Sequence, residues 1–122
     1  MENVSERHQL QSIQSLQSTI RKSENALTQM TQKGANTTLI EKRLRALNIG
    51  LSMLENVWHQ KPHSYTQEDL TEARNVLTGL MPSIENAFAK SKEGGPQKNL
   101  LKRRIQALEL AVHAIDDLLQ DN

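Results

Sequence analysis

One amphipathic pattern occurs twice in this sequence, first in residues 39–58 and again 61 positions later in residues 100–119. In each copy, apolar residues recur at alternating steps of four and three, which places them on one stripe of an α-helix because 3.6 residues make a turn. The two stripes are Ile40, Leu44, Leu47, Leu51, Leu54 and Trp58, and Leu101, Ile105, Leu108, Val112, Ile115 and Leu119. A second stripe, rich in small residues, widens each apolar face. Such a face needs at least two neighbouring helices, so both segments belong in a helical bundle.

The likeness extends to the whole chain. An offset of 61 aligns residues 1–61 with residues 62–122 without a gap and gives nine identities. The apolar pattern is also kept at pairs that are not identical, such as Ile20 with Met81 and Leu54 with Ile115. The chain is therefore interpreted as a duplicated helical hairpin. Two similar hairpins without common descent are the alternative.

Four helices are expected, joined by short connections. The first should span residues 6–32, because Gly34 suits the positive φ found just past a helix end. Thr38 and Glu41 have the spacing of a capping box for the second helix, which should stop shortly before Pro62. The second and fourth helices carry the wider apolar faces and are expected at the centre of the bundle.

The second hairpin has its own start and stop signals. Thr66 and Asp69 form another capping-box pattern, and the third helix should run to about Lys92 with a kink or a break near Gly79–Pro82. Pro96 fits the first turn of the fourth helix. Short loops make neighbouring helices antiparallel. The predicted fold is all-α, a four-helix antiparallel bundle forming a single domain over the whole chain.

Composition limits the classes of function. The sequence has no cysteine, no apolar run close to the roughly 20 residues of a membrane span and no signal-peptide pattern at its start. A cytoplasmic protein without a membrane partner is expected. The formal net charge of +1 does not indicate polyanion binding by charge alone.

No catalytic, cofactor or metal site is predicted. His59 and His63 have the spacing of a helical zinc pair, but Pro62 separates them and zinc needs three or four converging ligands. The second and fourth helices contain no Glu-x-x-His motif, and no glycine-rich phosphate loop is present. The chain is accordingly not expected to be an enzyme.

Charged residues also recur at the offset of 61. Glu24 and Arg43 in the first half match Glu85 and Arg104 in the second. A buried or half-buried ion pair in each hairpin would fix its register. Solvent-exposed side chains and a ligand-binding role are the alternatives.

Two further features recur and point to a partner. Basic residues begin the second and fourth helices, where positive charge opposes the helix dipole, and an anionic partner or a solvated face would account for them. One aliphatic residue in each of these helices lies opposite the apolar stripe, so either another helix covers it or another chain does. The candidate partner-binding residues are Lys42, Arg45, Ile49, Lys102, Arg103 and Leu110.

These observations lead to three hypotheses. The first is a non-enzymatic bundle that acts by protein–protein interaction, as an adaptor, regulator or assembly factor, with a protein partner or a second copy of itself. The second is a nucleic-acid-associated protein that uses the basic starts of the second and fourth helices. The third is a bundle that binds a small ligand or a metal.

Overall fold

The computed structural model describes residues 3–120, and in this part of the chain every regular element is an α-helix. The helices are α1 (Glu6–Gln32), α2 (Thr38–His59), α3 (Gln67–Lys90) and α4 (Pro96–Gln120). The predicted all-α, four-helix class is confirmed.

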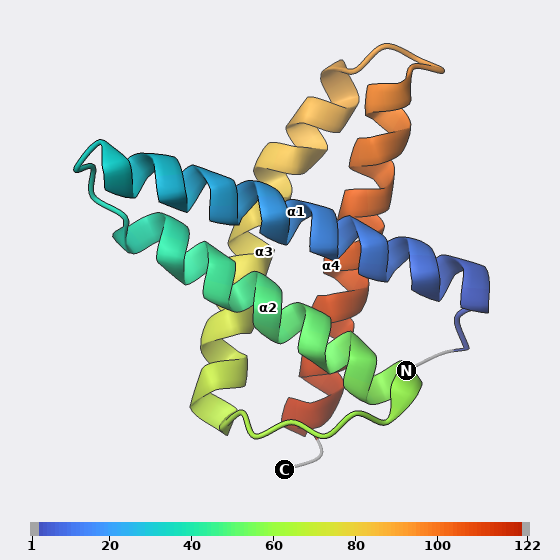
Figure 1. The fold of residues 1–122 in the computed structure, drawn as a ribbon. Helices are drawn as coiled ribbons and strands as arrows, with labels where there is room; N and C mark the ends of the chain where they lie inside the picture. Colours follow the sequence, from blue (N-terminus) through green and yellow to red (C-terminus); the bar gives the residue numbers. More distant parts are fainter. Residues whose placement is uncertain (1–2, 121–122) are drawn as a thin grey trace.

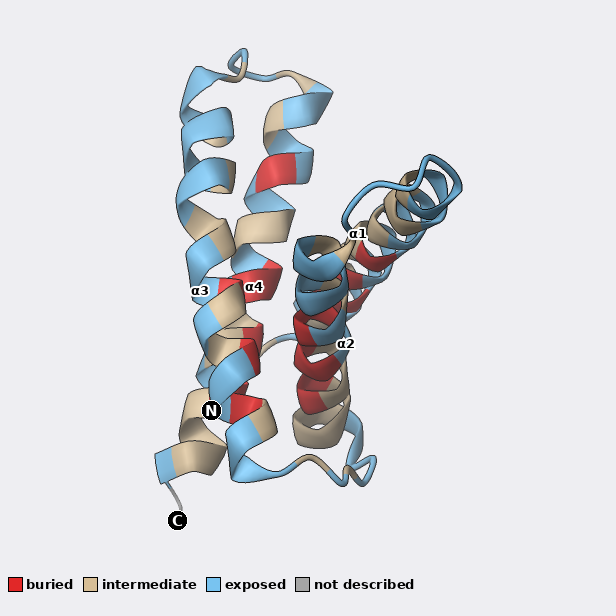
Figure 2. Ribbon diagram, turned by 90° about the vertical axis from the view of Figure 1, so that its left-hand side faces the viewer, coloured by how far each residue is buried: buried red, intermediate tan, exposed pale blue. Residues whose placement is uncertain are grey.

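The two hairpins cross each other (Figure 1). The first consists of α1 and α2, and the second of α3 and α4. Both α2 and α4 contact all three other helices, whereas α1 and α3 do not touch each other. Viewed from the side, the order is α3, α4, α2, α1 (Figure 2). The second and fourth helices are therefore central, as the width of their apolar faces predicts.

The core lies where the hairpins cross (Figure 2). Its largest fully buried side chains are Leu16, Leu47, Ile49, Met53, Leu54, Leu77, Leu108 and Ile115. Several of these residues pair at the offset of 61, such as Leu47 with Leu108 and Leu16 with Leu77. The two halves thus contribute equivalent positions to the core, while common descent of the hairpins stays a prediction.

Small residues let the two central helices approach closely at the crossing. A Cβ atom built on Gly50 would lie 3.2 Å from Cδ1 of Leu77 and 3.3 Å from Cβ of Ala111. Ala111 is the residue equivalent to Gly50 in the second hairpin. At this point α2 therefore lies close to Ala111 of α4, which is its own repeated small-residue position, and to Leu77 of α3.

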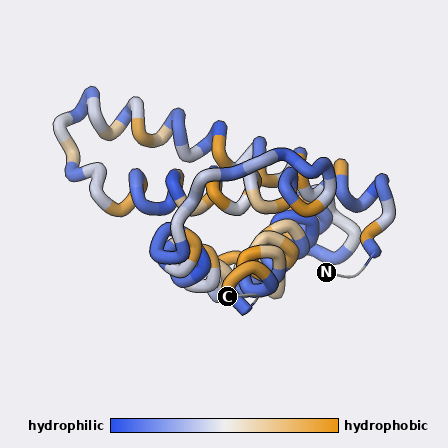
Figure 3. Tube along the Cα trace, turned by 90° about the horizontal axis from the view of Figure 1, so that it is seen from below, coloured by the Kyte–Doolittle hydropathy of each residue, from blue (hydrophilic) through white to orange (hydrophobic). Residues whose placement is uncertain are grey.

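Beyond the crossing, each hairpin continues as an arm that contains no buried residue. The arms comprise residues 21–45 and residues 78–100. Polar and apolar residues alternate along the first hairpin, as they do in amphipathic helices (Figure 3). Each arm is held by half-buried side chains, such as Leu27 and Ile40 in the first.

The capping box predicted at the start of α3 is present, and the one predicted at the start of α2 is not. The capping box of α3 is present, since the Thr66 hydroxyl accepts from the Asp69 amide and the Asp69 carboxylate accepts from the Thr66 amide. In α2 the predicted box is wrong, because Thr37 occupies the N-cap and Thr38 is already helical. The Thr37 hydroxyl donates to the Glu41 carboxylate at 2.7 Å instead.

The third helix runs through its proline without interruption and ends at Lys90, two residues before the predicted end. The expected break near Gly79–Pro82 is therefore wrong, while a kink there stays a prediction. Both Pro82 and Thr78 are exposed, so the Thr78 carbonyl that loses its amide partner lies at the surface of the arm.

Candidate binding groove between α1 and α4

The two repeated aliphatic residues outside the apolar stripes have different environments. Ile49 is 2% exposed, and it lies with Ala73 and Val76 between α2 and α3. The prediction that Ile49 meets a partner is wrong, because α3 covers this side of α2. Leu110 is half-buried on the equivalent side of α4, where α1 covers it only in part.

Leu110 lies in an open groove between α1 and α4 with a volume of about 310 Å³. Arg103, another candidate from the sequence, lines the same groove. The complete lining is Val4, His8, Gln11, Ser12, Arg103, Gln106, Glu109, Leu110 and His113. The structure thus brings two of the six predicted partner-binding residues together in one surface depression.

The crossing creates an equivalent crevice between α2 and α3. Shifted by 61 positions, Arg103, Gln106 and Leu110 of the groove correspond to Lys42, Arg45 and Ile49 of the crevice. The outer helices correspond as well, since His8, Gln11 and Ser12 match Asp69, Glu72 and Ala73. Yet the crevice has a volume of only about 10 Å³.

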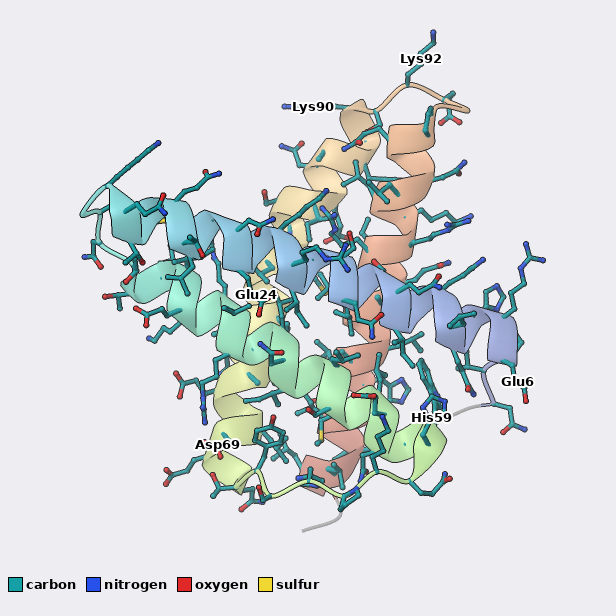
Figure 4. All side chains as sticks on the ribbon, viewed as in Figure 1. Glu6, Glu24, His59, Asp69, Lys90 and Lys92 are labelled. Carbon is teal, nitrogen blue, oxygen red and sulfur yellow. The ribbon has the colours of Figure 1, made fainter. Side chains whose placement is uncertain are left out.

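An ion pair across the α2–α3 crevice joins its two walls. The Arg45 guanidinium donates to the Asp69 carboxylate at 3.0 Å. The backbone amide of Thr66 and, after it, Arg45 lower the pKa of Asp69 below its ordinary value. Asp69 lies at the start of α3, where it faces α2 (Figure 4). This carboxylate therefore caps its helix and joins the two walls of the crevice.

No such ion pair crosses the α1–α4 groove in residues 3–120. The positions of Arg45 and Asp69 are taken there by Gln106 and His8. The His8 imidazole lies 3.1 Å from the Ser5 hydroxyl on its own helix. His113, on the other side of the groove, lies 3.6 Å from Asp117 one turn along α4. The side chains that line the groove leave it open.

The predicted ion pairs of the hairpins do not form in the described chain. Glu24, Arg43 and Glu85 are exposed, and Arg104 is half-buried with no hydrogen-bond partner for its Nε atom. Glu24, Arg43 and Glu85 lie on the arms, where the paired helices leave them open to solvent, whereas the Nε atom of Arg104 is buried. Between helices, charges pair nearer the crossing instead, at Arg45–Asp69 and at Arg74–Asp116.

The basic residues at the helix starts belong to different hairpins, since they lie in α2 and in α4 (Figure 1). Lys42 and Arg45 belong to the first arm, and Lys102 and Arg103 lie in α4 of the second hairpin. Lys102 is exposed, while Arg103 and Arg45 lie at the groove and the crevice respectively. They do not form one continuous basic surface.

The linker histidines do not meet as ligands. His59 is exposed at the end of α2 (Figure 4), whereas the His63 ring stacks on Tyr65 and accepts from the Tyr65 amide at 3.2 Å. In residues 3–120, no group of three or more metal-ligating side chains is placed to hold an ion. In the same residues, no helix has the length and apolar composition that crossing a membrane requires.

Most of the groove residues were not identified from the sequence. His8, Gln11 and Gln106 are polar and lie in helices without a recognisable motif, so only the crossing of the hairpins brings them together. The offset of 61 carries the one available signal, because it aligns His8 with Asp69 and Gln106 with Arg45. Comparison with known proteins finds no matching family model, curated protein or solved structure.

Proposed function

We propose that this chain is a non-enzymatic helical-bundle protein that acts by binding another protein, as an adaptor, regulator or assembly factor. The contact surface is the groove between α1 and α4. The observation that carries the proposal is the combination of a half-buried leucine, Leu110, with an exposed arginine, Arg103, in an open depression of about 310 Å³. Arginine is one of the residue types enriched among the hot spots of protein interfaces.

The shape and lining of the groove support a partner side chain as its occupant. Enclosed small-molecule sites have volumes of about 300–1,000 Å³ and cover most of the ligand. This groove lies at the lower end of that range and is open along its length. Ser12 is buried in its lining, Val4, Gln11 and Leu110 are half-buried, and Gln106 and Arg103 are exposed.

Site-specific photo-crosslinking in the native host tests the proposal. A photoreactive amino acid at Gln106, on the exposed edge of the groove, should give a covalent adduct with one protein. The same amino acid at Lys92, at the tip of the α3–α4 arm (Figure 4), is the control and should not give that adduct. Equal products from both positions, or none from Gln106, would contradict the proposal.

A salt titration against random DNA and RNA tests the competing hypothesis that this chain binds nucleic acid. Binding to phosphate releases counterions and must weaken steeply as salt rises. No binding is expected, because the basic helix starts belong to different hairpins. Tight, salt-sensitive binding would favour the nucleic-acid hypothesis.

A further inference from the structure

The two equivalent surface depressions differ in the charge of their outer helix. In the α2–α3 crevice, α3 presents the carboxylates of Asp69 and Glu72 to α2. In the α1–α4 groove, α1 presents His8 and Gln11 at the same positions. The outer wall has therefore exchanged its two carboxylates for an imidazole and an amide.

Of the two cations that α2 presents to the crevice, only one has a cationic equivalent in α4. Lys42 and Arg45 of α2 correspond to Arg103 and Gln106 of α4. The cation at the position of Arg103 is kept, but the helix opposite no longer supplies an acid. None of the ion pairs in the described part of the chain includes Arg103.

In residues 3–120, no carboxylate across the groove forms an ion pair with Arg103. Glu109 is the one acidic residue among the described residues that line it. It follows Arg103 by six positions on the same helix, which is about 9 Å along the axis. A guanidinium presents a planar fork of donors that matches a carboxylate, and at the surface of a groove that fork remains available to another molecule.

We propose that the α1–α4 groove binds a carboxylate side chain from an acidic segment of the partner protein. The Arg103 guanidinium receives the carboxylate, and Leu110 contacts an apolar side chain beside it. An acid of the partner would then lie against α4 beside Leu110, as Asp69 of α3 lies against Arg45 of α2 at the equivalent crevice. This inference rests on the proposed function and adds the chemistry of the partner to it.

A peptide titration followed by amide NMR shifts tests the chemistry directly. The probe is the capped peptide Leu-Glu-Glu-Leu at millimolar concentration, compared with Leu-Gln-Gln-Leu and Leu-Lys-Lys-Leu. The acidic peptide should shift the amides of Gln11, Gln106 and Leu110, and the other two should not. Equal shifts from the acidic and neutral peptides, or shifts confined to other helices, would overturn the proposal.

Matched variants identify the cation. Arg103→Gln should weaken binding of the acidic peptide at least about tenfold, the loss expected for a charge-assisted hydrogen bond. Lys92→Gln makes a similar charge change at an exposed residue that does not line the groove, and it should retain the affinity. Arg103 is exposed, so circular dichroism should show an unchanged fold. Unchanged affinity in Arg103→Gln would refute the assignment.

A double variant tests the comparison between the halves. His8→Asp with Gln106→Arg places an acid and a base where Asp69 and Arg45 join the walls of the crevice. The new pair should close the groove and abolish peptide binding while α-helical content is retained. Undiminished binding of the acidic peptide would show that the groove is not its site.

The outcomes separate this inference from the proposed function. If Gln106 crosslinks to a protein but the acidic peptide does not bind, protein binding stands and the carboxylate chemistry is wrong. If inorganic phosphate binds in place of the peptide, the groove is an anion site of a different class and the inference fails. If neither crosslinking nor peptide binding is seen, both proposals fail.

Discussion

Truncation of one leucine in each half measures how the crossing stabilises the protein. Leu47 and Leu108 are 2% and 1% exposed at equivalent positions of α2 and α4. A change to alanine removes three carbon atoms, whose transfer from water is worth about 2.4 kcal/mol at about 0.8 kcal/mol per methylene. The cavity left behind adds to this loss, so each change should lower the free energy of unfolding by about 2.5–4 kcal/mol.

Chemical denaturation and thermal melting would measure the loss. With about 2.1 cal/mol/K of unfolding entropy per residue, a loss of 3 kcal/mol should lower the melting temperature by about 12 °C. Leu39→Ala and Leu100→Ala are matched controls, because these leucines are 58% and 41% exposed. The controls should change stability by less than about 1 kcal/mol. If Leu47→Ala and Leu108→Ala lowered the free energy of unfolding no more than the controls do, the crossing would not be the core.

Three further changes probe other parts of the structure. Gly79→Ala should stabilise the protein by about 0.5–1 kcal/mol, because no side chain or neighbouring helix lies within 4 Å of the added Cβ. Gly50→Ala should raise the free energy of unfolding by less, or lower it, because its added Cβ is crowded. The denaturant midpoints of the two variants measure this difference. The changes Glu24→Gln and Arg43→Met should be additive in a double-mutant cycle, and a coupling above about 0.5 kcal/mol would reveal an ion pair that the structure does not contain. Asp69→Asn should reduce stability at neutral pH and progressively less in acid. The pKa of the Asp69 carboxyl is lowered in the folded state, so its charged form stabilises the fold at pH values above the ordinary pKa, and this stabilisation is lost as the pH falls through the folded pKa. An equal loss of stability at pH 7 and in strong acid would contradict this role.

The parts of the fold fixed by neighbouring residues could be predicted from the sequence. The first helix spans Glu6–Gln32 as expected, Gly34 has a φ of 72°, and the Thr66 box is present. Each of these features depends on residues within about one helical turn. The N-cap of α2 is Thr37 and not the predicted Thr38, because two adjacent threonines could each serve as the cap.

Features that depend on the angle between the hairpins could not be predicted. Ile49 and Leu110 occupy equivalent helical positions, but only the outer helix of the other hairpin decides how far each is covered. The same holds for Arg103, which occupies the position equivalent to Lys42 yet lacks an acidic wall opposite. Side-chain periodicity specifies which face of a helix is apolar and does not specify which helix covers the remainder.

The absence of buried residues in both arms has a consequence for hydrogen exchange. Amides at the crossing, near Leu47 and Leu108, can exchange only when the whole protein unfolds. Those in residues 21–45 and 78–100 lie in segments without a buried residue, so each arm can open while the crossing stays intact. The chain should therefore show three levels of amide protection, with two tips that open independently and one slow centre shared by both halves.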